Sequence, residues 1–228
     1  MSHSVGKLWK SMAADRMASN AGRIRGSILR DFLRWYRDAK GSKRIAEIIE
    51  SLEGEDRELF DPTDDSFGLA AREWYPAIVV HQIMDRMTAG MSDDEFEDFA
   101  REAALGVSEL IQTGVYRTMF RFAFTPDRYA THIQKMWDRL YDSGRVRAEP
   151  VTDTEHRILV EDWRSHHPLL CRIQSLSRAE NYRLMGCEGI ELHRDRCVGE
   201  GADSCEVVMR WRRWLPRFWR STGRRSRG

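Results

Sequence analysis

The residues best suited to chemistry are four cysteines near the carboxyl end of the chain, Cys171, Cys187, Cys197 and Cys205. Thiolates bind metal ions or pair as disulfides, whereas unmodified cysteines behave as small buried hydrophobes. The opening residues, MSHSVGKLWKSMAADRM, lack the apolar stretch of a secretion signal, so we expect the reducing environment of the cytoplasm. A disulfide framework is therefore not expected, and a metal site and buried free thiols stay open as alternatives.

Histidines and carboxylates give weaker indications of chemistry. Among the seven histidines, His81 lies within an apolar helical stretch and is the candidate haem ligand, although a core histidine fits the same pattern. His166 and His167 precede Pro168 and predict an exposed start of a helix. The acidic cluster Asp93–Asp98 opens a predicted helix, where carboxylates favour the dipole, so we interpret it as solvated. No catalytic pattern supports an enzyme.

The elements that must position these residues follow from the spacing of apolar side chains. A helical period runs through about 26–40, 45–53, 76–89, 92–114 and 125–143, and Ser92 with Glu95 matches a capping box. After Gly144 the period changes to two. Strands are predicted near 146–148, 157–163, 190–198 and 205–211, with a helix over 168–185 between the second and third. The order predicts an α+β fold, with an N-terminal helical layer followed by a ββαββ antiparallel sheet half.

The length of 228 residues and the 41% hydrophobic content allow one domain with a substantial core. No apolar run is long enough to cross a membrane. We expect a weakly ordered segment over 1–24, a single α+β domain over 25–211 and a basic aromatic tail over 212–228.

Charge separates the tail from the rest of the chain. Residues 210–228 hold eight arginines and no acid, which leaves 29 of the 37 basic groups against all 36 acidic groups, a net charge of −7. The body has no basic stripe, so the domain itself is not expected to bind nucleic acid, and stacking of the tail on single-stranded nucleic acid is the least favoured alternative. The tail interleaves aromatic and basic side chains, which favours contact with an anionic membrane or a partner. Packing of its aromatics on the domain is the alternative. The candidate contact residues are Arg212, Arg213, Trp214, Arg217, Phe218, Trp219 and Arg220.

Five short motifs recur in order in a known family. They are Gly26-Ser27-Ile28-Leu29, Glu73-Trp74-Tyr75-Pro76, Gly114-Val115-Tyr116-Arg117, Leu140-Tyr141-Asp142-Ser143-Gly144, and the closing stretch from Gly201 to Trp211. The chain resembles a bacterial family with many paralogues in myxobacteria. That family is similar in fold to 4-vinyl reductase domains, haem–NO-binding-associated domains and TRAPP subunits. The resemblance implies a ligand-binding or scaffolding module of bacterial signalling, and the TRAPP likeness implies a homodimer through the helix over 96–114.

The resemblance also implies a metal site. In the vinyl-reductase-type sensor domains of phenol-responsive regulators, three cysteines with a similar spacing hold a structural zinc ion, which here implies Cys171, Cys197 and Cys205. Those regulators carry a glutamate three residues before the middle cysteine. Arg194 occupies that position here and cannot ligate zinc. Three residues could supply the missing ligand: His193, Asp195 and Cys187. Without it, buried free thiols are the alternative.

We therefore expect a non-enzymatic, intracellular sensory or scaffolding module that binds a small apolar ligand or a partner protein. Two other functions compete with it. One is an enzyme acting on a hydrophobic small molecule, and the other is a peripheral membrane adaptor that uses the basic tail.

Overall fold

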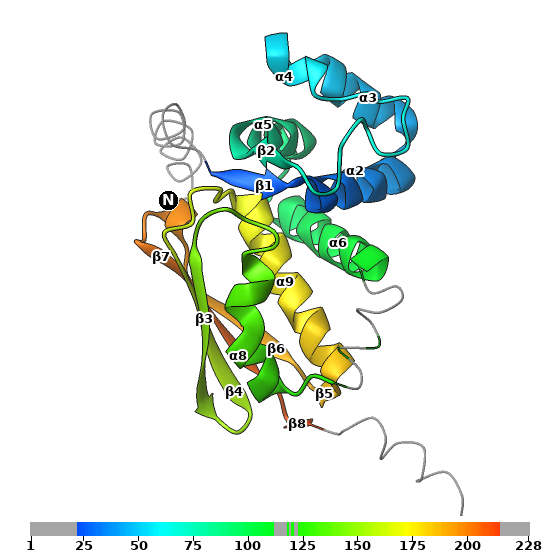
Figure 1. Cartoon of the computed structure of the whole chain (residues 1–228). Helices are drawn as coiled ribbons and strands as arrows, with labels where there is room; N and C mark the ends of the chain where they lie inside the picture. Colours follow the sequence, from blue (N-terminus) through cyan, green and yellow to red (C-terminus); the bar gives the residue numbers. More distant parts are fainter. Residues whose placement is uncertain (1–21, 112–117, 119, 121–122, 215–228) are drawn as a thin grey trace, which may run out of the picture.

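The structure is a computed structural model that describes residues 22–111, 118, 120 and 123–214. Its helical layer lies at the top of Figure 1. All but the shortest of its helices bury an apolar face. The helices of this layer are α2 (Gly26–Lys40), α3 (Ser42–Glu50), α4 (Gly54–Glu58), α5 (Ala77–Thr88) and α6 (Asp93–Ile111). A short antiparallel pair, β1 (Arg23–Arg25) with β2 (Trp74–Pro76), joins the start of this layer to the start of α5.

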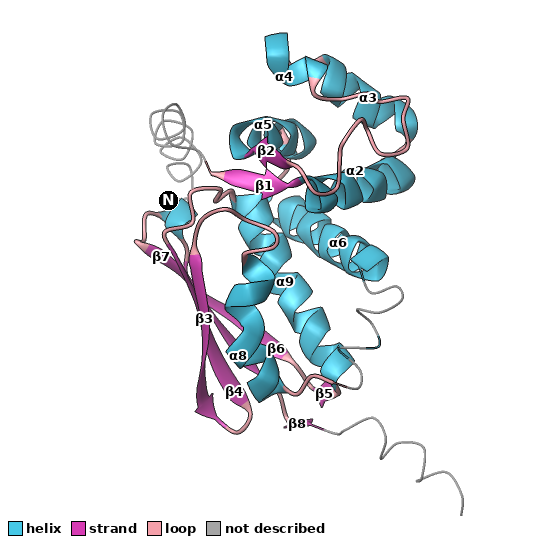
Figure 2. Cartoon of the chain, in the orientation of Figure 1, coloured by secondary structure: helices cyan, strands magenta, loops and turns pink. Residues whose placement is uncertain are grey.

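The second half is an antiparallel sheet with two helices on one face (Figure 2). The strand order is β3-β4-β7-β6. The strands are β3 (Arg145–Thr152), β4 (Glu155–Glu161), β6 (Glu191–Arg196) and β7 (Ser204–Arg210). The helices are α8 (Pro126–Trp137), which packs against β3, and α9 (Pro168–Met185), which packs against β6 and β7. The predicted α+β fold with a ββαββ half is confirmed.

The two halves meet where α6 lies against α9. Ser92 and Glu95 form the predicted capping box before α6, because the Ser92 amide donates to Glu95 Oε2 at 2.8 Å and the Glu95 amide donates to Ser92 Oγ at 3.3 Å. The acidic residues that follow are exposed or half-buried, as predicted for a solvated helix start. The other side of α6 packs on α2. A dimer through this helix stays a prediction.

One detail of the fold differs from the sequence analysis. The last described strand, β8 (Arg213–Trp214), pairs with β5 (Cys187–Glu188), so the first residues of the predicted tail are attached to the end of α9. No helix within the described residues is both long and apolar enough to cross a membrane.

Candidate metal centre

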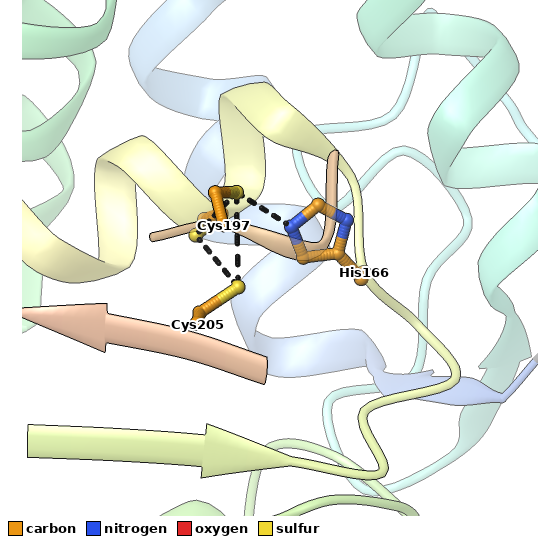
Figure 3. Close-up of side chains that lie close together, drawn as sticks. His166, Cys197 and Cys205 are labelled. Atoms are coloured by element: carbon orange, nitrogen blue, oxygen red, sulfur yellow. Dashed lines mark hydrogen bonds between the residues drawn. The ribbon is translucent and has the colours of Figure 1, made fainter. Parts of the chain in front are cut away.

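Four elements bring one histidine and three cysteines to a single point. His166 lies in the turn before α9, and Cys171 lies in the first turn of that helix. Cys197 immediately precedes the 3-10 turn η1 (Val198–Glu200), and Cys205 lies on β7. The labelled side chains of His166, Cys197 and Cys205 point toward one another in Figure 3. Gly201 follows η1 with a φ of 91°, a backbone conformation that favours glycine. The chain turns at this residue and enters β7, which brings Cys205 close to Cys197.

The three sulfur atoms are spaced like the corners of a zinc tetrahedron, and the imidazole nitrogen of His166 lies beside them. The Sγ–Sγ distances are 3.6 Å for Cys171–Cys205, 3.7 Å for Cys197–Cys205 and 3.8 Å for Cys171–Cys197. His166 Nε2 lies 3.4 Å from Cys197 Sγ, and all four donor atoms lie within 4.8 Å of one another. A zinc tetrahedron with Zn–S bonds of about 2.3 Å has edges of about 3.75 Å. A disulfide needs about 2.05 Å between its sulfur atoms, so these thiols are not paired as disulfides.

Burial and mutual contacts set the ionisation of this cluster. All three cysteines are buried and His166 is half-buried. The Cys171 and Cys205 thiols hydrogen-bond to Cys197 and hold its pKa far below the ordinary value, while the same contacts raise the pKa of Cys171. Burial alone would lower the pKa of His166, but Cys197 and Cys205 raise it to about 9. Without a metal, the cluster is therefore an imidazolium beside a thiolate, and metal binding releases protons from it.

The fourth donor is a residue that the sequence analysis placed elsewhere. His166 and His167 were predicted to lie exposed at the start of α9, but His166 joins the cluster and His167 is buried. His167 caps α9, since its Nδ1 accepts from the Leu169 amide at 3.2 Å. The missed signal is the position of His166, five residues before Cys171.

The three candidates for the fourth ligand lie outside the cluster. His193 is exposed, and its Nε2 lies 3.3 Å from Asp195 Oδ1. Cys187 is buried on β5, where burial raises the pKa of its thiol to about 12. Arg194, which replaces the glutamate of the phenol-responsive regulators, forms an ion pair with Glu200. The four-donor set therefore differs from the one implied by the resemblance, with a histidine replacing the glutamate.

The structure describes the basic segment that follows β7 only as far as Trp214. Arg213 Nε donates to Glu188 Oε2 at 2.7 Å, and Trp214 Nε1 donates to the Met185 carbonyl at 2.9 Å. The Arg212 amide donates to the Glu188 carbonyl at 2.9 Å. The remaining predicted contact residues lie outside the described residues: Arg217, Phe218, Trp219 and Arg220.

Comparison with known proteins gives a fold and no family. No family model and no curated protein matches the chain. The Fe(II) unliganded H-NOX protein from K. algicida matches with a TM-score of 0.57 at 14% identity, covering 84% of this chain and 98% of that one. An H-NOX protein mutant from S. oneidensis matches with a TM-score of 0.54 at 12% identity, covering 84% and 97%. The fold is thus H-NOX-like, which supports the haem–NO-binding part of the resemblance. The likeness to 4-vinyl reductase and TRAPP proteins stays a prediction.

The H-NOX fold implies haem, but the described histidines do not fit an axial ligand. The Nε2 atom of His81 lies 3.1 Å from the Ser165 carbonyl oxygen. The centroid of the His81 ring lies 5.2 Å from that of the His167 ring. Burial lowers the pKa of His81 to about 4, so it is a neutral core histidine. His156 is also buried, with Nδ1 2.6 Å from the Tyr182 hydroxyl, and His132 is exposed. Within the described residues, the donor set suits zinc rather than haem.

Proposed function

We propose that this chain is a non-enzymatic sensory or scaffolding module of H-NOX-like fold, built around a structural zinc ion. The closed set of His166, Cys171, Cys197 and Cys205 carries the proposal. Catalytic zinc sites keep one position open for water, whereas structural sites use four protein ligands of this type. When bound, zinc would supply a cross-link and no reaction chemistry.

The position of the cluster explains why a cross-link matters. It connects the turn before α9, the first turn of α9, the chain before η1 and the start of β7. Zinc there would hold α9 against the sheet at the end where α9 begins. The opposite end of α9 is held by β5 and β8. A helix fixed at both ends preserves the interior between α9, α8 and the sheet, which is where the module would bind its ligand.

Metal analysis of the purified full chain tests the proposal. We expect about one equivalent of zinc per chain by elemental analysis and native mass spectrometry. Cys171→Ser, Cys205→Ser and His166→Ala each remove a ligand and are expected to lose zinc and unfold at lower temperature. Cys187→Ser is the matched control, because it removes a buried cysteine outside the cluster.

Two results would contradict the proposal. One is a metal-free protein whose unfolding midpoint is unchanged by added zinc or by a chelator. The other is stoichiometric haem uptake on incubation with haemin, with an absorption spectrum that changes in His81→Ala.

A further inference from the structure

Arg178 is a buried cation that has no carboxylate partner among the described residues. It lies on α9 and is 6% exposed. Its guanidinium carbon lies 5.5 Å from the centroid of the Trp137 ring, and the group hydrogen-bonds to the Tyr129 hydroxyl. Among the described residues, no carboxylate lies within ion-pair distance of it. The segments that the structure does not describe contain a single acidic residue, Asp15.

A second arginine on the same helix shows the usual arrangement. Arg172, also largely buried, places its Nε atom 2.7 Å from Glu97 Oε2 on α6. Its charge is therefore neutralised within the protein. Arg178, two turns later, meets only neutral groups in the described structure. Of these two guanidinium groups on α9, only that of Arg172 has a carboxylate partner within the described part of the chain.

Three buried tyrosines lie within the electrostatic range of the guanidinium. Tyr129, Tyr141 and Tyr182 are each at most 2% exposed. Burial raises the pKa of each phenol, and the charge of Arg178 opposes that rise in all three, so the guanidinium is close to all of them. The surroundings therefore combine one full positive charge, phenolic hydroxyls and the apolar faces of aromatic rings.

An unneutralised guanidinium in this environment is costly. Removing a charged group from water costs several kcal/mol unless a counter-ion and hydrogen bonds compensate. Arg has five N–H donors in a planar fork that matches a carboxylate in a bidentate arrangement. A cation–π contact with Trp137 recovers only part of this cost. An anion from outside the chain would supply the missing compensation.

We propose that Arg178 binds the carboxylate of a small organic acid whose apolar body lies against Trp137 and Tyr129. This inference rests on the proposed function and names the chemical class of its ligand. The guanidinium selects the charge, and the aromatic surroundings select an apolar body over a hydrated inorganic anion.

Benzoate and octanoate test the inference on the zinc-loaded full chain. We expect both to bind by isothermal titration calorimetry and to raise the unfolding midpoint, while uncharged benzamide does neither. Arg178→Met should weaken binding about 100-fold, as expected for loss of a charged partner from a buried pair. Arg183→Met, at an exposed position of the same helix, should bind like the wild type.

Stability without any added acid separates a binding role from a structural one. If Arg178 is there for a ligand, Arg178→Met leaves the midpoint of the acid-free protein unchanged or raised, because methionine fills a similar volume without a buried charge. A lowered midpoint would mean that Arg178 supports the fold and would overturn the inference. Arg178→Lys keeps the charge but loses the planar fork, so it should weaken benzoate binding about 10-fold in a protein that stays folded.

Failure of this inference can be distinguished from failure of the proposed function. Zinc-loaded protein that binds neither carboxylate, or that binds benzamide as well as benzoate, overturns the inference and leaves a module for a partner protein. Protein without zinc fails the proposed function itself.

Discussion

Trp137 is the last residue of α8 and packs against aromatic side chains of the segments that follow. Its ring centroid lies 4.4 Å from that of Tyr141 and 4.8 Å from that of Trp163. Its Nε1 donates to the Ser143 carbonyl at 2.9 Å. The side chain is 3% exposed, so its predicted place on the inner face of this helix is confirmed. Aromatic contacts of this kind add to the free energy gained from burial.

Replacing Trp137 with alanine should lower the free energy of unfolding by about 3–5 kcal/mol, because it leaves a large cavity and an unpaired carbonyl. Urea denaturation followed by circular dichroism measures the change. Trp137→Phe keeps most of the apolar volume and should cost clearly less. A loss below about 1 kcal/mol for the alanine variant would contradict the burial of this ring.

His156 makes stability depend on pH. Its side chain is 1% exposed, Nδ1 lies 2.6 Å from the Tyr182 hydroxyl, and burial lowers its pKa. Asp127, with Oδ1 3.8 Å from His156 Nε2, only partly opposes this effect. Below the unfolded-state pKa of about 6.5, the unfolded chain binds a proton that the folded chain does not. Stability contributed by neutral His156 is therefore lost as the pH falls below about 6.5.

The expected result is a smaller loss of unfolding free energy between about pH 7 and pH 5 in His156→Gln than in the wild type. Denaturant titrations of each protein at both pH values give the slope of its unfolding free energy against pH. His193→Gln, at an exposed position, serves as the control and should retain the wild-type slope. Equal slopes for all three proteins would show that His156 does not carry the effect.

At the scale of elements, the packing of α2 against α6 depends on one glycine. Gly106 faces Trp35, and a Cβ atom at Gly106 would lie within 1.8 Å of the Trp35 ring. The absence of a side chain at Gly106 therefore allows α6 to pack closely on α2. In a solvated helix, alanine is more stable than glycine by about 1 kcal/mol. Here the steric contact reverses that preference.

Gly106→Ala should therefore lower the unfolding free energy by more than about 1 kcal/mol despite its better helix propensity. Thermal and urea denaturation measure it. Leu105→Ala, one residue earlier at a position 44% exposed, is the control and should change stability by about 0.5 kcal/mol or less. An unchanged or more stable Gly106→Ala protein would mean that Trp35 moves freely away from α6.

For the whole molecule, the distribution of charge suggests how it would meet other surfaces. Residues 1–209 carry a net charge of −7 and the following residues carry eight arginines. Arg213 is paired with Glu188 and Trp214 donates to Met185, so these two residues belong to the folded body. A membrane contact would then depend on the residues after Trp214, which include five arginines, Phe218 and Trp219.

We expect the full chain to sediment with anionic vesicles at low salt and to bind neutral vesicles poorly. Each arginine near an anionic surface contributes about 1 kcal/mol, and salt screens the attraction. Truncation after Trp214 should abolish binding and leave the unfolding midpoint unchanged. Truncation after Trp211 should lower that midpoint, because it removes β8. Full-length protein that stays in the supernatant at low salt would exclude an anchoring role.

The elements of this fold are largely determined by local sequence. The starts of three helices follow from nearby residues: Gly26 begins α2, and Ser92 with Glu95 caps α6. Thr125 caps α8, and Pro126 is the first residue of that helix. The change of period after Gly144 marks the start of the sheet half. These features depend on residues a few positions apart, where backbone geometry and side-chain spacing act directly. Fold class could therefore be predicted without the structure.

The composition of the candidate sites was decided only by tertiary structure. Cys171, Cys197 and Cys205 were indicated by a resemblance, but His166 joins them because the turn before α9 lies beside the start of β7. Burial of Arg178 likewise depends on α8 and the chain after it, which bring Tyr129, Trp137 and Tyr141 against α9. A histidine before a proline and an arginine within a helix are both compatible with exposure, and the five-residue separation of His166 from Cys171 is by itself too weak a signal to predict a shared site. Distant segments set these contacts, and free energies of packing summed over the whole core determine which segments meet.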